Sequence, residues 1–371
     1  MPGPLLLPGR SRRRRPGYGG AGTRNARLHP FDSRSMWNMP IGSDAVLRPA
    51  GLADALGATN QRVTVDPLIA GFSESDPVYE MRTITYVRNS SGAIVNLTGV
   101  YVIPAGTMVH VPAGTVHDAR WNGIAGFLLQ GTGGRYAFHG QAVEVDTGTG
   151  LAPGWGRTSK THEDGTAGPA NIRGWVDLLG SGRSGAHGGG GNSGIGGCVR
   201  AWEWDAMGLA TYPQHALSMN LHGLRFLSNA LSGYRWPAFK ADTGYNDPAH
   251  QNYYGRTGVS DGEGGTYDGM RMGTLLCLPS GYDRTWITDP KAFALSRSLE
   301  YYGAYVCDVT TSDRHAFTVE KTRESAWNNQ GTTFHRELMT VINALKYVDN
   351  NSETTIGGGG TPRVPLLPDP A

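Results

Sequence analysis

Side chains that suit acid–base catalysis are spread over the second half of the sequence. Asp242 lies in an aromatic segment, Asp308 and His315 lie on either side of a short turn, Glu203 lies within a strand-like run, and His187 is surrounded by glycine. A glycosidase needs two carboxyl groups about 5 to 10 Å apart, and a histidine can transfer protons near neutral pH. These five residues are the candidate catalytic residues.

The segment around His187 has the most unusual composition. In residues 181–197, SGRSGAHGGGGNSGIGG, nine of seventeen residues are glycine. Glycine allows positive φ and close backbone approach, so either a ligand lies against Gly190 and Gly191 or strands cross there. His187 itself is either an acid–base or ligand-binding group or a structural hydrogen-bonding histidine.

The expected strand register would bring Asp308 close to His315. The strand-like segments 304–310 and 315–320 flank the four residues TSDR, which predicts a hairpin. Asp308 would then be a diagonal neighbour of His315 on one sheet face. A carboxylate that orients an imidazole is a common acid–base arrangement, although structural Asp–His pairs are as common.

The segment from Tyr234 to Arg256 concentrates aromatic rings among charged groups. Flat apolar ring faces beside directional hydrogen-bonding groups suit sugars. The alternative is that the rings pin a long loop to the core. The candidate ligand-binding residues of this segment are Tyr234, Arg235, Trp236, Lys240 and Tyr245.

Metal and cofactor motifs do not stand out. The sequence contains no zinc-protease helix, nucleotide-binding loop or nucleophile elbow. Cys198, Cys277 and Cys307 are far apart and are interpreted as small buried apolar residues. We therefore predict no metal and no cofactor.

The elements that must position these residues are mostly strands. Alternating patterns predict strands at 79–88, 94–103, 108–111, 124–129, 199–204 and 217–222, the first two forming a hairpin. Two helices are predicted late in the chain, one capped by Thr288 or Asp289 before Pro290 and one starting at Thr332 or Thr333. The expected fold is mainly β, with a β-sandwich or jelly-roll-like antiparallel core and the two C-terminal helices packed at one side.

Composition agrees with a loop-rich β protein. The 371 residues include 55 glycines and 22 prolines. Only 17% of the residues are charged, whereas about 25% are charged in ordinary soluble domains. The net charge is +2, and without Arg10 and residues 12–15 it falls to −3, so the body has no basic surface for nucleic acid. The sequence contains no run of 18 apolar residues, so we predict no membrane-spanning helix.

The chain divides by composition into three parts. Residues 1–30 form an irregular arm rich in glycine, proline and arginine, 31–356 form a single β-rich body, and 357–371 form an irregular C-terminal tail. The start of the chain does not match a secretory leader. An arm of this composition is either frayed or attaches to a neighbouring subunit.

Three segments carry a family resemblance: FDSRSMWNMPIG from Phe31, AHGGGGNSGIGG from Ala186 and DNNSETTIGGGGTPRVPL from Asp349. They resemble parts of minor tail proteins of phages that infect actinobacteria, and of related uncharacterised extracellular actinobacterial proteins. The resemblance implies a location in the virion tail, extracellular on release. It implies no catalytic residue.

Together these observations predict a virion tail-associated protein that recognises or trims a host cell-surface glycan. Its expected partners are other tail proteins, through residues 1–30, the host polysaccharide, and further copies of itself in a homo-oligomer. Two alternatives stay open. One is a glycoside hydrolase or lyase that acts on bacterial cell-wall polysaccharide, and the other is a purely structural tail or decoration protein.

Overall fold

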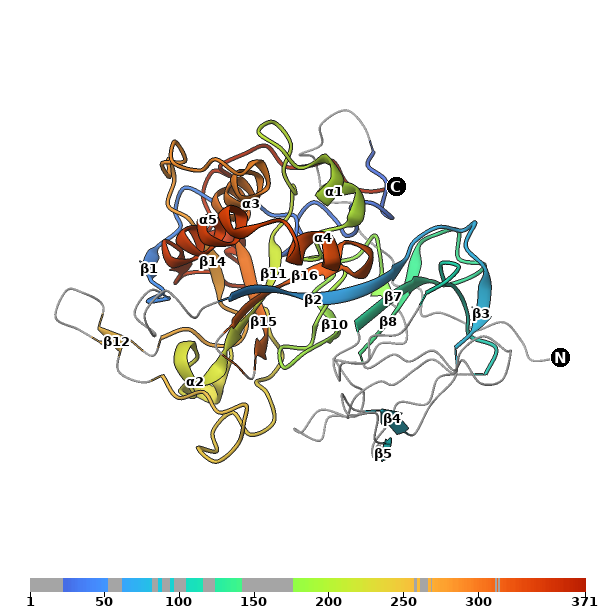
Figure 1. Ribbon diagram of the computed structural model, residues 1–371, viewed down its shortest axis with the longest axis horizontal. Helices are drawn as coiled ribbons and strands as arrows, with labels where there is room; N and C mark the ends of the chain where they lie inside the picture. Colours follow the sequence, from blue (N-terminus) through green and yellow to red (C-terminus); the bar gives the residue numbers. More distant parts are fainter. Residues whose placement is uncertain are drawn as a thin grey trace.

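The computed structural model describes most of the chain (Figure 1). The described residues are 23–52, 62–81, 86–88, 94–96, 105–115, 124–141, 176–256, 259–260, 266–267, 269–310, 312 and 314–371. Most of the predicted arm, residues 1–22, lies outside these ranges.

The main feature is a ten-stranded mixed sheet with the order β1-β17-β14-β15-β11-β16-β2-β7-β8-β9. Its strands are β1 Leu47–Pro49, β17 Lys346–Val348, β14 Leu275–Cys277, β15 Ala304–Thr310, β11 Leu217–His222, β16 Arg314–Glu320, β2 Arg62–Gly71, β7 Ile124–Leu128, β8 Tyr136–Gly140 and β9 Val176–Asp177. Strand β10, Ser184–His187, belongs to the glycine-rich segment and makes isolated bridges to Asn192.

Three short antiparallel pairs lie outside this sheet. They are β3 Val78–Glu80 with β6 Met108–His110, β4 Tyr86–Arg88 with β5 Ile94–Asn96, and β12 Val259–Ser260 with β13 Thr266–Tyr267. The pairing of β4 with β5 confirms the antiparallel contact expected of the first predicted hairpin, whose connection at 89–93 lies outside the described residues.

The mainly-β class is confirmed, whereas the predicted antiparallel core needs correction. Pairs β11–β15, β16–β2 and β2–β7 are parallel, so the sheet is mixed. Parallel pairs need long connections and are covered on both faces. The finer sandwich or jelly-roll topology is not confirmed.

The predicted hairpin of 304–310 with 315–320 is wrong, although both strands exist. Strand β11 lies between β15 and β16, so that Asn220 is opposite Asp308 on one side and Ala316 on the other. The apolar residues of β11 are completely buried there. Burial of this third strand therefore takes precedence over local pairing across the short turn.

Helices cover one face of the central strands. They are α3 Pro290–Tyr301, α4 Glu324–Asn328 and α5 Thr332–Asn343, and Figure 1 shows them on the opposite side of the sheet from α2, Gly223–Phe226, and β10. Both predicted C-terminal helices are confirmed. No helix in the described ranges combines the length and apolarity needed to cross a membrane.

One predicted strand is a helix. Segment 199–204 begins with a single bridge from Val199 to Val319 and then forms α1, Ala201–Ala206. The Glu203 side chain accepts a hydrogen bond from the backbone N–H of Arg200 at 2.9 Å. This is half of a capping box, and it satisfies a backbone group at the start of the helix.

The ends of the described chain meet on the surface of the body. The Arg24 side chain donates to the carbonyls of Pro368 and His29, and Asp369 accepts from the backbone N–H of Ser33 at 2.7 Å. Residues 23–30 therefore contact the C-terminal segment. The division into arm, body and tail stays a prediction.

The N-cap of α3 provides a test of the fold. Asp289 Oδ1 accepts from the N–H groups of Lys291 and Ala292 at 2.9 and 3.0 Å. We expect Asp289→Ala to lower the free energy of unfolding by about 1 kcal/mol, because two N–H groups lose their acceptor. Asp289→Asn keeps an acceptor oxygen and should lower it less. Urea unfolding of the three proteins measures the difference, and equal midpoints would contradict the assigned cap.

Candidate functional site

The candidate site lies on the face of the central strands that is turned away from the helices α3 and α5. Asp308 comes from β15, Asn220 and Ser218 come from β11, and Asp66 comes from β2. The alternation of β11 predicts a half-exposed strand, yet five of its six residues are buried. Its polar side chains therefore face a buried polar cluster rather than water.

The glycine-rich segment places His187 in this cluster. His187 Nε2 lies 2.8 Å from Asp66 Oδ2, and Nδ1 lies 3.3 Å from Ser218 Oγ. Asn220 Nδ2 donates to the same Asp66 oxygen at 2.8 Å. Burial opposes a charge on His187, but the hydrogen bond to Asp66 and the nearby carboxylates outweigh it, and the pKa of His187 is raised. An imidazolium at His187 is thus favoured by its surroundings.

Asp242 joins the cluster from the aromatic loop. Tyr254 Oη donates to Asp242 Oδ2 at 2.6 Å, and the backbone N–H of Asp242 donates to Tyr254 Oη at 3.1 Å. Asp308 Oδ1 accepts from the N–H of Gly189 at 3.0 Å. The carboxyl groups of Asp308 and Asp242 lie against the neighbouring residues Gly188 and Gly189 and interact electrostatically.

The two carboxyl groups share one protonation equilibrium. Burial first, and then repulsion from Asp242, raise the pKa of Asp308 to about 7, while burial also raises the pKa of Asp242. Burial and the neighbouring Asp242 raise the pKa of Tyr254 far above its usual range, so its hydroxyl stays a neutral donor. A proton held between two adjacent carboxylates relieves their repulsion.

Consecutive glycines make room for these carboxyl groups. A Cβ on Gly188 would lie 2.2 Å from Asp308 Cγ, and one on Gly189 would lie 2.3 Å from Asp242 Cγ. Gly190 donates to the carbonyl of Cys307 at 3.0 Å and accepts from Phe239, and Gly191 accepts from Gly185 at 3.0 Å. The close approach expected of glycine is thus made to strand β15 and to the carboxylates.

The aromatic rings of the loop mainly hold it to the body. Trp236 is half-buried, with its ring centroid 6.4 Å from that of Tyr305, and Tyr245 packs against Tyr254 at 5.7 Å. These contacts match the loop-pinning alternative. Tyr234 is half-buried and forms a backbone bridge to Met272. Arg235 forms an ion pair with Asp349. The charge of Lys240 favours the ionised form of Asp242.

His315 does not pair with Asp308, in contrast to the predicted register. Its ring is buried beside Phe226, at a centroid distance of 5.2 Å, and neither ring nitrogen has a hydrogen-bond partner among the described residues. The reason is that β11 separates the two strands. His315 is therefore a core residue.

Glu203 also lies apart from the cluster. Its Oε2 is 3.2 Å from His215 Nε2, and its Oε1 is 3.6 Å from His29 Nε2. Although burial disfavours the charge, the contact with His215 holds the pKa of Glu203 below its usual range. Glu203 therefore serves α1 and the segment that contains His29.

Of the five candidate catalytic residues, the structure thus brings together Asp242, Asp308 and His187. Four further members of the cluster were not predicted from the sequence: Asp66, Asn220, Ser218 and Tyr254. A signal for Asp66 was present, because a carboxylate inside the apolar run VTVDPLIA is unusual for a buried strand.

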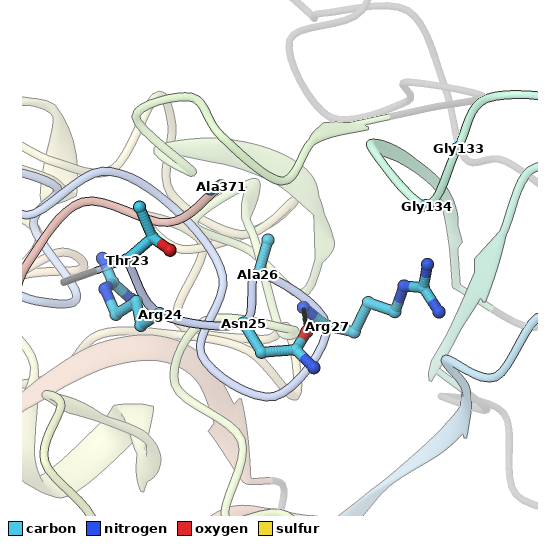
Figure 2. A pocket seen from close by; sticks show the side chains of 8 residues that line it. All are labelled: Thr23, Arg24, Asn25, Ala26, Arg27, Gly133, Gly134 and Ala371. Carbon is cyan, nitrogen blue, oxygen red and sulfur yellow. Dashed lines mark hydrogen bonds between the residues drawn. The ribbon is translucent and has the colours of Figure 1, made fainter.

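A surface pocket of about 450 Å³ lies elsewhere, between residues 23–27, the C-terminal residue and the turn at Gly133 (Figure 2). Its lining residues are Thr23, Arg24, Asn25, Ala26, Arg27, Gly133, Gly134 and Ala371. None of them belongs to the carboxylate cluster, so the pocket does not mark the candidate site.

Comparison with protein-family models, curated proteins and solved structures finds no match to this chain.

The contact between Gly189 and Asp242 can be tested by a double-mutant cycle. We expect Gly189→Ala to destabilise the fold by about 1 to 3 kcal/mol, as overpacking does, because the new methyl group would meet the carboxyl group. In the Asp242→Ala background the cost should shrink. Gly208→Ala is the control, since nothing lies within 4 Å of a Cβ there. Additive effects in urea unfolding would contradict the contact.

We expect His315 to affect the free energy of unfolding at acid pH and not to take part in catalysis. Burial, with His222 nearby, lowers its pKa from 6.5 to about 4. Between these values the unfolded chain binds a proton that the folded chain does not, so stability falls as the pH drops through this window. We expect His315→Phe to reduce the loss between pH 7 and pH 5 by up to about 2 kcal/mol. An unchanged pH dependence of urea unfolding would show that the pKa of His315 is not lowered in the folded state.

Proposed function

We propose that this chain is a hydrolase of a cell-surface glycan and that Asp242 and Asp308 are its acid–base pair. The observation that supports this most is the placement of two buried carboxyl groups side by side over Gly188 and Gly189. A pair that shares one proton offers an acid and a base in one place. Asp308, with the pKa of about 7, is the proton donor, and Asp242 is the base.

The surrounding residues support these roles. Tyr254 holds Asp242 through its hydroxyl group, and Gly189 holds Asp308 through its N–H. The positive charge favoured on His187 stabilises negative charge in the cluster. These three residues are positioning residues, because they act through the carboxyl groups.

The glycan as substrate is inferred from the chemistry of paired carboxylates. In glycosidases the two groups stand about 5 Å or more apart, so a bound glycosidic oxygen or water has to separate Asp242 from Asp308. Asp242 and Asp66 are the more exposed carboxylates of the cluster, at 8% and 7%.

A pure binding function has less support. It would need exposed aromatic faces, whereas Trp236 is half-buried and packs against Tyr305. The location in a phage tail, release to the extracellular space, attachment through residues 1–30 and a homo-oligomeric state are proposals that rest on the resemblance of the three segments and on composition.

The function is tested with actinobacterial cell-wall polysaccharides, arabinogalactan among them, and product analysis. We expect Asp308→Asn and Asp242→Asn each to lower the rate at least about 100-fold, because proton transfer contributes that much, while adsorption to the polysaccharide persists. Asp205→Asn is the matched control, an exposed carboxylate paired with Arg323. Release of product by both cluster variants at the rate of this control would contradict the assignment.

A further inference from the structure

We infer that Asp66, His187 and Asp308, together with the amide oxygen of Asn220, form a binding site for one divalent transition-metal ion. One donor atom from each of Asp66, His187 and Asp308 lies within 4.8 Å of the others, and all three residues are buried. Ligands of one ion show such spacing, because two donors at about 2.1 Å from a metal are separated by about 3 to 4 Å.

Asn220 supplies an independent observation. Its side chain is 3% exposed, and Oδ1 has no hydrogen-bond partner among the described residues. The Nδ2 atom is bonded to Asp66 at 2.8 Å, and the residue lies opposite Asp308 in the register of β11 with β15. The amide group is therefore held against Asp66, on the strand next to the one that carries Asp308, with its acceptor oxygen unused. A buried acceptor without a donor is costly, and a cation would satisfy it.

The negative charge of the cluster also favours a bound cation. Asp66, Asp242 and Asp308 are three buried carboxylates, and His187 is the basic side chain in hydrogen-bond contact with Asp66. Burying negative charge without full compensation is unfavourable. A divalent ion would provide two positive charges at this point, and it would be the largest local charge in the site.

The surroundings of His187 suit a metal ligand. A ligating histidine usually bonds through its second ring nitrogen to a protein acceptor, which fixes the tautomer. Ser218 Oγ lies 3.3 Å from Nδ1, so Nε2 is left for the ion. The distance of 2.8 Å between Nε2 and Asp66 Oδ2 is close to the separation of neighbouring ligands. On binding, the proton on Nε2 would be released to water.

The donor set selects among cations. Calcium and magnesium take oxygen ligands, whereas imidazole suits first-row transition metals. Two carboxylates, one amide oxygen and one imidazole offer both oxygen and nitrogen ligands, and manganese(II) accepts ligands of both kinds.

This inference deepens the proposed function, on which it rests only for the catalytic use of the ion. With an ion bound, Asp308 would be a ligand and no longer the proton donor, Asp242 would remain the base, and the ion would supply Lewis-acid polarisation in place of the Asp308 proton.

Binding is tested without any substrate. The full chain is treated with a chelator, dialysed and titrated with MnCl₂, and free Mn²⁺ is followed by its electron paramagnetic resonance signal. We expect one Mn²⁺ to bind per chain and to raise the melting temperature. Asp66→Asn and Asn220→Leu should each weaken binding at least tenfold, whereas Asp205→Asn should not.

The variants have to be folded for this comparison, and circular dichroism checks this. Replacing Asp66 by Asn removes a buried charge and keeps the shape, so the metal-free variant should fold. If the wild-type chain does not reduce the signal of free Mn²⁺, the inference is wrong. It is also wrong if Asp66→Asn and Asn220→Leu both bind Mn²⁺ as the wild type does, because the ion would then lie elsewhere. Mn²⁺ binding without product from any glycan would instead contradict the proposed hydrolase and leave the metal site intact.

Discussion

The burial of Asp308 on a central strand is the constraint on which the surrounding structure depends. A carboxyl group there cannot be solvated, so its neighbours must supply a proton, hydrogen-bond donors or positive charge. The N–H of Gly189, the carboxyl group of Asp242 and the nearby imidazole of His187 do so from different parts of the chain. Segments far apart in sequence are therefore brought together by one side chain.

The glycine-rich segment follows from this constraint. Its backbone has to lie directly on two carboxyl groups while it also hydrogen-bonds to β15 at Cys307. Any side chain at Gly188 or Gly189 would occupy the space of a carboxyl group. The aromatic loop serves the same purpose, since Tyr254 at its far end orients Asp242.

Sequence patterns predicted both C-terminal helices and several strands, but they missed β2, took the start of α1 for a strand, and identified the cluster only in part. The caps and apolar spacing of 290–301 and 332–343 are local signals, and both helices form where these signals place them. Asp242, Asp308 and His187 could be selected because each lies in an unusual segment. Asp66 and Asn220 could not be joined to them, because their contacts depend on which strands are neighbours. The insertion of β11 also explains the error for His315, since a short turn does not exclude a third strand.

That insertion has a consequence for how the chain folds. Strands β15 and β16 are separated by only a few residues, yet each pairs with β11, which lies over 80 residues earlier at 217–222. The local hairpin of β15 with β16 that the short connection would allow is not the native pairing, because β11 pairs with both strands. Folding thus depends on non-local contacts, which are slow to form. During synthesis, β11 leaves the ribosome first, so vectorial folding would favour the native order.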